Sequence, residues 1–204
     1  MTLEPDQNRT TTLCLTVEKG RVPFFFPLLA RGFTVKTRVG CSVKELICRH
    51  LGLSADYLEQ RLQTIFLDGK AVDDTETAVV RQGATLALST AMPGLAGATL
   101  RRGSAYAAMR NQITHQKNAN DERSKDGTIC LKLFNLVAED IGQLFLSQGI
   151  WISGKYFQDL FRGAPGPIFS GCRSVEMDGV RIEAEALVST DWEQTRIFLK
   201  INAV

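Results

Sequence analysis

Hydrophobic and polar residues alternate in short stretches of the first half of the chain. Residues 11–18 and 33–39 each place their apolar side chains at every second position. This period predicts two half-buried β-strands. Residues 83–89 predict a third strand, and Asp68-Gly69, which lies between apolar residues, predicts a tight turn between two short strand segments.

The period changes to that of a helix after Ser42. Ser42 and Glu45 have the spacing of a capping box, and Gly52 ends the pattern. A second helical stretch is predicted near residues 55–60. The apolar phase of these strands and helices predicts a core that includes Leu15, Val35, Leu46, Ile47, Ile65, Leu67, Leu86 and Leu88.

The order strand, strand, helix, short strand with a turn, strand is the topology of a β-grasp. Residues 11–97 resemble the small sulfur-carrier proteins of thiamine and molybdopterin biosynthesis, which are relatives of ubiquitin. The resemblance rests on Leu51-Gly-Leu53 after the capped helix, on the turn in residues 67–73, and on Arg81-Gln-Gly83 before the last strand. It implies a ubiquitin-like fold for this half of the chain.

The resemblance ends where the carriers perform their chemistry. Those proteins end in a free Gly-Gly tail, whereas here Gly94 and Gly97 follow the last strand and the chain continues to Val204. A carrier function would therefore require cleavage after Gly97. The simpler interpretation of both glycines is that they serve turns.

The second half of the chain predicts an α+β domain that resembles no family. Residues 128–134 predict a strand. Asn135 is expected to cap a helix with Val137, Ile141, Leu144 and Phe145 on one face, and Ser153 a second helix that ends at Gly163. An antiparallel meander is expected to follow, with strands at 175–177, 180–188 and 196–201.

Charge and composition divide the chain into three parts. Residues 96–125 carry six basic and two acidic residues and are rich in turn-forming side chains. We therefore expect a β-grasp domain over 1–97, a basic polar linker over 98–127 and an α+β domain over 128–204. No internal repeat is convincing in the sequence.

The basic linker carries the one candidate binding site. Ser104 is placed to cap a helix, and Arg101 and Arg102 come just before it. Two arginines there oppose the positive end of the helix, so they would be tolerable in water and favourable beside a bound anion or an acidic partner surface. A solvated basic turn is the alternative. Nucleic acid is disfavoured, because few aromatic residues lie among the basic ones.

Other motifs do not indicate catalysis. Gly149–Tyr156 is one residue short of a P-loop, has Tyr where Ser or Thr holds magnesium, and fits a helix end, a buried strand and a helix start better. His50 is predicted to pack on the apolar side of its helix, and Cys48 two residues away is expected on the other side. No cofactor and no metal site are indicated.

Composition narrows the class of protein. The hydrophobic fraction of 44%, the net charge of +2 and five scattered cysteines without a C-x-x-C pair indicate a cytoplasmic protein with free thiols. No run is long enough to span a membrane, and no secretory signal is apparent. We therefore expect a protein-interaction or scaffolding protein that binds another protein. The cleaved sulfur carrier is the alternative, and an enzyme with a pocket between the two halves is a third. The oligomeric state stays open.

Overall fold

The structure of the chain is a computed structural model, which describes residues 9–90, 94–103, 105, 124–163 and 170–204. The fold is mixed α and β, and its strands pair mostly antiparallel. The chain divides into two compact units. We call residues 34–138 the central unit and Met1–Phe33 with Glu139–Val204 the discontinuous unit.

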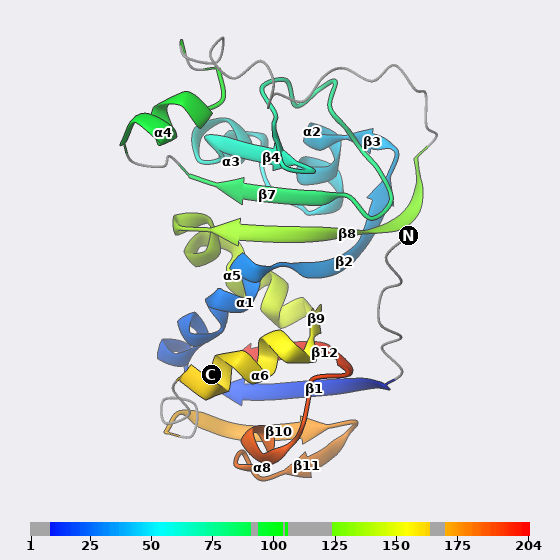
Figure 1. Ribbon diagram of the computed structural model, residues 1–204, viewed down its shortest axis with the longest axis vertical. Coiled ribbons are helices and arrows are strands. Elements are labelled where there is room, and N and C mark those ends of the chain that lie inside the picture. The colour runs from blue at the N-terminus through cyan, green and yellow to red at the C-terminus, as the bar shows by residue number, and fades with distance from the viewer. Residues whose placement is uncertain (1–8, 91–93, 104, 106–123, 164–169) are drawn as a thin grey trace. The chain divides into compact units, whose positions relative to one another are not determined.

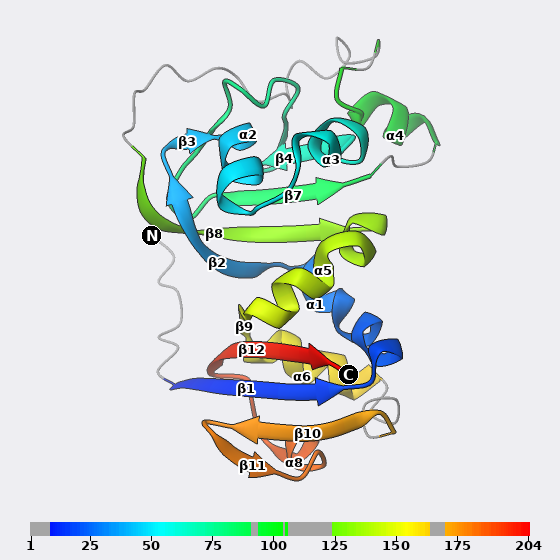
Figure 2. The ribbon, with the colours of Figure 1, turned by 180° about the vertical axis from the view of Figure 1, so that it is seen from behind.

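The central unit is a five-stranded sheet covered by short helices. Its strands follow one another in the order β2-β8-β7-β4-β5, and a separate two-stranded ladder joins β3 to β6. Figure 2 shows α2 and α3 in front of this sheet. The elements are β2 (Phe33–Val39), β3 (Cys41–Ser42), α2 (Val43–Glu45), the π-helix η2 (Leu46–His50), α3 (Ala55–Gln60), β4 (Thr64–Leu67), β5 (Lys70–Ala71), β6 (Val79–Val80), β7 (Thr85–Ser89), α4 (Gly94–Leu100) and β8 (Lys125–Phe134).

Alternation along these strands builds the core of the central unit. Every second residue of β4, β7 and β8 is buried, and the apolar stripe of α2 and η2 is buried as well. The expected cap is present, because Ser42 Oγ accepts a hydrogen bond from Glu45 N at 3.1 Å. Of the core residues predicted from the sequence, all are buried except Val35, which is half-buried.

In the discontinuous unit five strands pair in the order β11-β10-β1-β12-β9. Figure 1 shows α6 in front of β12 and β1. The buried rings of Phe157, Phe161 and Trp192 pack edge to face beneath this helix. The elements are β1 (Arg9–Val17), the 3-10 helix η1 (Lys19–Phe25), α1 (Phe26–Arg31), α5 (Leu136–Gln148, whose first turn belongs to the central unit), β9 (Ile150–Ser153), α6 (Gly154–Gly163), β10 (Cys172–Met177), β11 (Val180–Ile182), α8 (Ala186–Ser189) and β12 (Thr195–Ala203).

This division differs from the expected one, which placed boundaries at residues 1–97, 98–127 and 128–204. β1 does not form a hairpin with β2; it pairs in parallel with β12 and antiparallel with β10. The physical reason is the connection, since η1 and α1 fill the space where a hairpin turn would be needed. β8 likewise pairs in parallel with β7, so residues on both sides of the expected linker belong to one sheet.

The two units repeat one strand pattern. In the central unit Leu67 faces Leu86 across β4 and β7, and Leu86 faces Leu131 across β7 and β8. In the discontinuous unit Met177 faces Leu13 across β10 and β1, and Leu13 faces Leu199 across β1 and β12. The turns Asp68-Gly69 and Asp178-Gly179 have matching backbone angles, with φ of 52° at each aspartate. The structure thus reveals a repeat that the sequence analysis did not find.

Three local expectations in the second half change. Residues 180–188 do not form one long strand, because β11 ends at Ile182 and Leu187 is buried from the short helix α8. Asn135 has a φ of 53° and its side-chain amide donates to Ser89 Oγ at 3.1 Å, so it is not the expected cap. Leu144 of α5 is exposed.

No helix in the described part of the chain is both long enough and apolar enough to cross a membrane.

Candidate functional site

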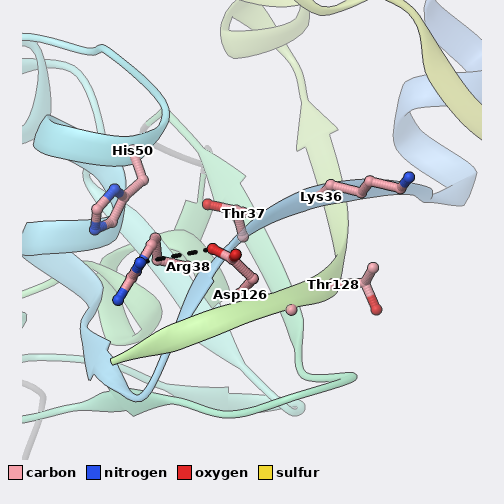
Figure 3. A pocket seen from close by; sticks show the side chains of 7 residues that line it. Lys36, Thr37, Arg38, His50, Asp126 and Thr128 are labelled. Carbon is pink, nitrogen blue, oxygen red and sulfur yellow. Dashed lines mark ion pairs between the residues drawn. The ribbon is translucent and has the colours of Figure 1, made fainter. Parts of the chain in front are cut away.

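An open pocket of about 560 Å³ lies in the central unit, between the end of η2 and the strands β2 and β8. Figure 3 shows side chains from all three elements around it. Its lining residues are Lys36, Thr37, Arg38, His50, Asp126, Gly127 and Thr128. A volume of this size is within the range of small-molecule binding sites.

The π-helix η2 places His50 at the pocket. Leu51 N donates to Leu46 O at 2.9 Å, a bond from residue i+5 to residue i that widens the last turn before the chain leaves the helix. Leu46 and Ile47 are buried, so the start of this turn is fixed by the core and its last residue, His50, projects at the edge. Short π-helical turns often occur at functional sites.

Two polar atoms in the pocket lining are buried and have no hydrogen-bond partner among the residues that the structure describes. They are Nε2 of His50 and Oγ1 of Thr37. In Figure 3 the Thr37 hydroxyl is turned to the side of the pocket where the His50 ring lies. A buried polar atom without a partner costs free energy, and most such atoms in folded proteins are satisfied. Two of them in one pocket therefore call for an explanation.

Arg38 supplies a fixed cation at the same end. Its Nη2 donates to Ser124 O at 2.6 Å and its Nε donates to Ser124 Oγ at 3.1 Å. Nη1 faces Asp126 Oδ1 at 3.6 Å, which is longer than a hydrogen bond, and the Asp126 side chain is 95% exposed. The guanidinium is thus held from one side. Among the described residues, the counter-charge of Nη1 is weak and exposed to solvent.

The strand β8 forms the opposite wall. The side-chain amide of Gln82 clamps Thr128: its Oε1 accepts from Thr128 N and its Nε2 donates to Thr128 Oγ1, each at 2.9 Å. A Cβ on Gly127 would overlap Gln82 Oε1 and come within 2.7 Å of Val39 Cγ2. Glycine is required there for close packing. At this end Lys36 Nζ points away from His50 and Arg38 (Figure 3).

The sequence-predicted basic site lies elsewhere in the central unit. The Arg102 side chain is only 11% exposed, and its Nη2 donates to Glu59 Oε2 at 2.8 Å and to Leu58 O at 3.3 Å. Arg102 is therefore already engaged by the end of α3. Arg101 N donates to Gly97 O at 3.0 Å, and Ser104 lies outside the described residues. Anion binding by this trio stays a prediction.

The carrier-like glycines belong to a helix. Gly94 is the first residue of α4, with a φ of 78°, and Gly97 lies buried inside it. The P-loop-like residues 149–156 form the end of α5, the strand β9 and the start of α6, which confirms the structural interpretation given from the sequence.

The five cysteines are all unpaired in the structure. Burial is the main cause that raises the pKa of the thiols of Cys41, Cys48, Cys130 and Cys172. A raised pKa keeps a thiol protonated, and the thiolate is the nucleophile. Among the described residues, no group of three His, Cys, Asp or Glu side chains is placed to hold a metal ion.

A smaller pocket of about 180 Å³ lies in the discontinuous unit between α1 and α6. Its cation, Arg31, donates to Asp159 Oδ2 at 2.7 Å and its guanidinium carbon lies 5.3 Å from the ring centre of Tyr156. Because Arg31 already has a carboxylate and an aromatic partner, this pocket offers less to a ligand than the pocket at His50.

Comparison of the chain with protein-family models, with curated proteins and with solved structures found no match. Sequence reasoning placed His50 in the core and gave no role to residues 36–38 or 126–128. No motif connects these segments, because the pocket joins positions about ninety residues apart through strand pairing. One signal was present: His50 is the polar residue on an otherwise apolar helix face.

Proposed function

We propose that the protein is a non-catalytic protein-interaction or scaffolding protein and that its central unit is a ubiquitin-like β-grasp. The observation that carries the proposal is the strand order β2-β8-β7-β4-β5, with the helix α2–η2 between β2 and β4. The sequence analysis assigned the first β-grasp strand to residues 11–18. In the sheet of the central unit β8 takes that position, although β8 is the last strand of the unit along the sequence. The β-grasp would thus be circularly permuted.

The side of the central sheet away from its buried face supports an interaction role. Phe66, Ala87 and Lys132 are aligned across β4, β7 and β8, and all three are half-buried. Their neighbours along each strand are buried in the core, so this row belongs to the other face. An aromatic ring and a lysine in one row of a regular sheet are suitable contacts for a protein partner with acidic and apolar groups.

The thiols are consistent with a cytoplasmic location. All five are unpaired, as expected of a protein in a reducing compartment.

The sulfur-carrier alternative receives less support. It needs residues 94–97 to enter an activating enzyme as an extended tail, whereas these residues begin the helix α4. Intact-mass measurement of the native protein tests this alternative: a fragment that ends at Gly97 would favour it over the interaction function.

The test of the interaction function is co-purification of the full chain from its own cells, followed by measurement of the mass of the complex. We expect a stoichiometric protein partner, and we expect Lys132→Glu to reduce its recovery. Lys155→Glu makes the same charge change at an exposed position of α6 and should leave recovery unchanged. Recovery of the chain alone from wild type, or equal loss with both variants, would contradict the proposal.

A further inference from the structure

We propose that the pocket at His50 and Arg38 binds a small molecule through a terminal oxyanion, a phosphate or a carboxylate group. This inference goes beyond the interaction function and does not depend on it, because the pocket can hold a small molecule whether or not the chain binds another protein. The site is formed by residues of the central unit alone.

The unpartnered atoms define the chemistry of the ligand. Thr37 Oγ1 can donate its O–H, and His50 can donate from Nε2, yet neither has an acceptor among the described residues. Arg38 Nη1 adds a permanent positive charge at the same end of the pocket. A group that supplies several acceptor oxygens and a negative charge matches the two donors and the cation of this pocket lining.

Asp126 explains how the site stays intact without a ligand. Its carboxylate is the counter-charge of Arg38 Nη1, but the ion pair measures 3.6 Å and Asp126 is almost fully exposed. An exposed pair of this length is weak, so an oxyanion can take over Nη1. Arg38 itself does not move away, because Ser124 holds its Nε and Nη2.

The rest of the pocket sets the size of the ligand. Its volume of about 560 Å³ is much larger than a single phosphate or carboxylate group, so the oxyanion is one end of a larger molecule. The other end would lie near Lys36 and Thr128, beside Gly127 of β8. This end offers a second cation and a hydroxyl, which favours a polar molecule over an apolar one.

The experiment is a titration of the isotopically labelled full chain with inorganic phosphate and, separately, with acetate, followed by NMR at constant ionic strength. We expect saturable shifts of the backbone signals of Gly127 and Thr128 and of the His50 ring. Stronger binding of phosphate would assign the ligand to phosphate esters, and stronger binding of acetate to carboxylates. Unsaturable or absent shifts with both anions would overturn the proposal.

Two variants with opposite expected effects sharpen the test. Arg38→Gln should weaken binding about tenfold, the loss expected for one charged hydrogen bond. Asp126→Asn removes the competing carboxylate and should strengthen binding several-fold. Arg49→Gln is the matched control, because Arg49 lies next to His50 and its side chain is 75% exposed. Equal weakening by Arg38→Gln and Arg49→Gln would show only general charge attraction and would contradict the site.

A third variant separates binding from folding. Thr37→Val keeps the shape of the side chain and removes a hydroxyl that has no partner in the described part of the chain. The variant should therefore fold at least as well as wild type, since no internal hydrogen bond is lost. We expect it to bind the anion several-fold more weakly. A variant that is fully folded and binds as well as wild type would remove Thr37 from the site, and the same result with Arg38→Gln would overturn the proposal.

Discussion

Asp178 Oδ1 accepts a hydrogen bond from the backbone N–H of Thr12 at 2.7 Å, across 166 positions of the sequence. Asp178 N in turn donates to Thr12 O at 2.9 Å. The central unit contains the same pair of bonds between Asp68 and Thr85, at 2.7 and 2.8 Å. In each unit one aspartate both forms the tight turn of a strand pair and binds the backbone of the neighbouring strand.

This relationship makes Asp178 a test of how β1 is held. Asp178→Ala removes the acceptor for Thr12 N and places an alanine at a φ of 52°, which alanine rarely adopts. We expect the free energy of unfolding to fall by about 1–2 kcal/mol, because the bond has a charged acceptor but is exposed. Urea denaturation monitored by tryptophan fluorescence measures this loss.

Asp178→Asn is the control for that prediction. Asparagine keeps a side-chain oxygen and tolerates a positive φ, so the variant should lose less stability than the alanine variant. Asp68→Ala should show a loss similar to that of Asp178→Ala, because Asp68 makes the same two bonds in the central unit. If both alanine variants unfold like wild type, the two anchors do not contribute to stability.

The same residues show why the repeat is hidden in the sequence. The segment Thr85-Leu-Ala-Leu-Ser89 corresponds to Thr12-Leu-Cys-Leu-Thr16. The first segment comes after its turn at Asp68, whereas the second comes long before its turn at Asp178. A comparison that runs along the sequence cannot align segments that occur in a different order. Alternation predicts which face of a strand is buried, and it does not say which strand lies beside it.

Local structure could be predicted where it depends on residues close together in the sequence, as strand alternation, helix caps and tight turns do. β2 has the predicted bounds, Ser42 caps its helix, and both Asp-Gly turns are present. Residues 180–188 were mispredicted because their alternation continues through a helical turn whose Leu187 is buried by tertiary packing. The pocket at His50 could not be predicted, because it depends on which segments the sheet brings together.

The buried thiols predict how stability depends on pH. Burial raises the pKa of Cys41, Cys48, Cys130 and Cys172 above that of the same thiols in the unfolded chain. Above about pH 8.5, where ordinary cysteines ionise, the unfolded chain therefore releases protons that the folded chain retains. Stability from these thiols is fully present below that pH and is lost as the pH rises towards the folded pKa values.

We expect the urea midpoint to be constant from pH 7 to about pH 8 and to fall between about pH 8.5 and 9.5. A Cys130→Ala, Cys172→Ala double variant should show a smaller fall over the same range, since two of the four raised pKa values are removed. The slopes of the two midpoint curves are compared, because the loss of two half-buried thiol groups also changes the absolute stability of the variant through packing. A midpoint that rises with pH in this window would be the opposite of the expected sign.

Gly154 at the start of α6 is predicted to be intolerant of a side chain. A Cβ at this position would overlap the Trp192 carbonyl oxygen and would lie 2.7 Å from Thr195 O. Both neighbours are backbone atoms that cannot rotate away, so Gly154→Ala should destabilise the protein by about 1–3 kcal/mol. Gly20→Ala is the control, because no atom lies within 4 Å of its added Cβ. Thermal unfolding should separate the two variants, and equal midpoints would show that the backbone at Trp192 can move.

The last prediction distinguishes a structural from a binding role for Arg102. Its guanidinium joins Glu59 Oε2 and Leu58 O at the end of α3, where the helix dipole also favours a cation. Arg102→Gln should therefore lower the free energy of unfolding by about 1–2 kcal/mol. Glu59→Gln should cause a smaller loss, because Glu59 is 61% exposed and Leu58 O would remain as a partner of Arg102.

The same Arg102→Gln variant should titrate with phosphate like wild type under conditions where both are folded, because its guanidinium is already occupied. Arg38→Gln provides the contrast, since within the described ranges Nη1 of Arg38 faces the exposed carboxylate of Asp126. If Arg102→Gln loses phosphate binding while Arg38→Gln retains it, then the anion binds at Arg101 and Arg102, as the sequence analysis predicted, and the pocket at His50 is not the oxyanion site.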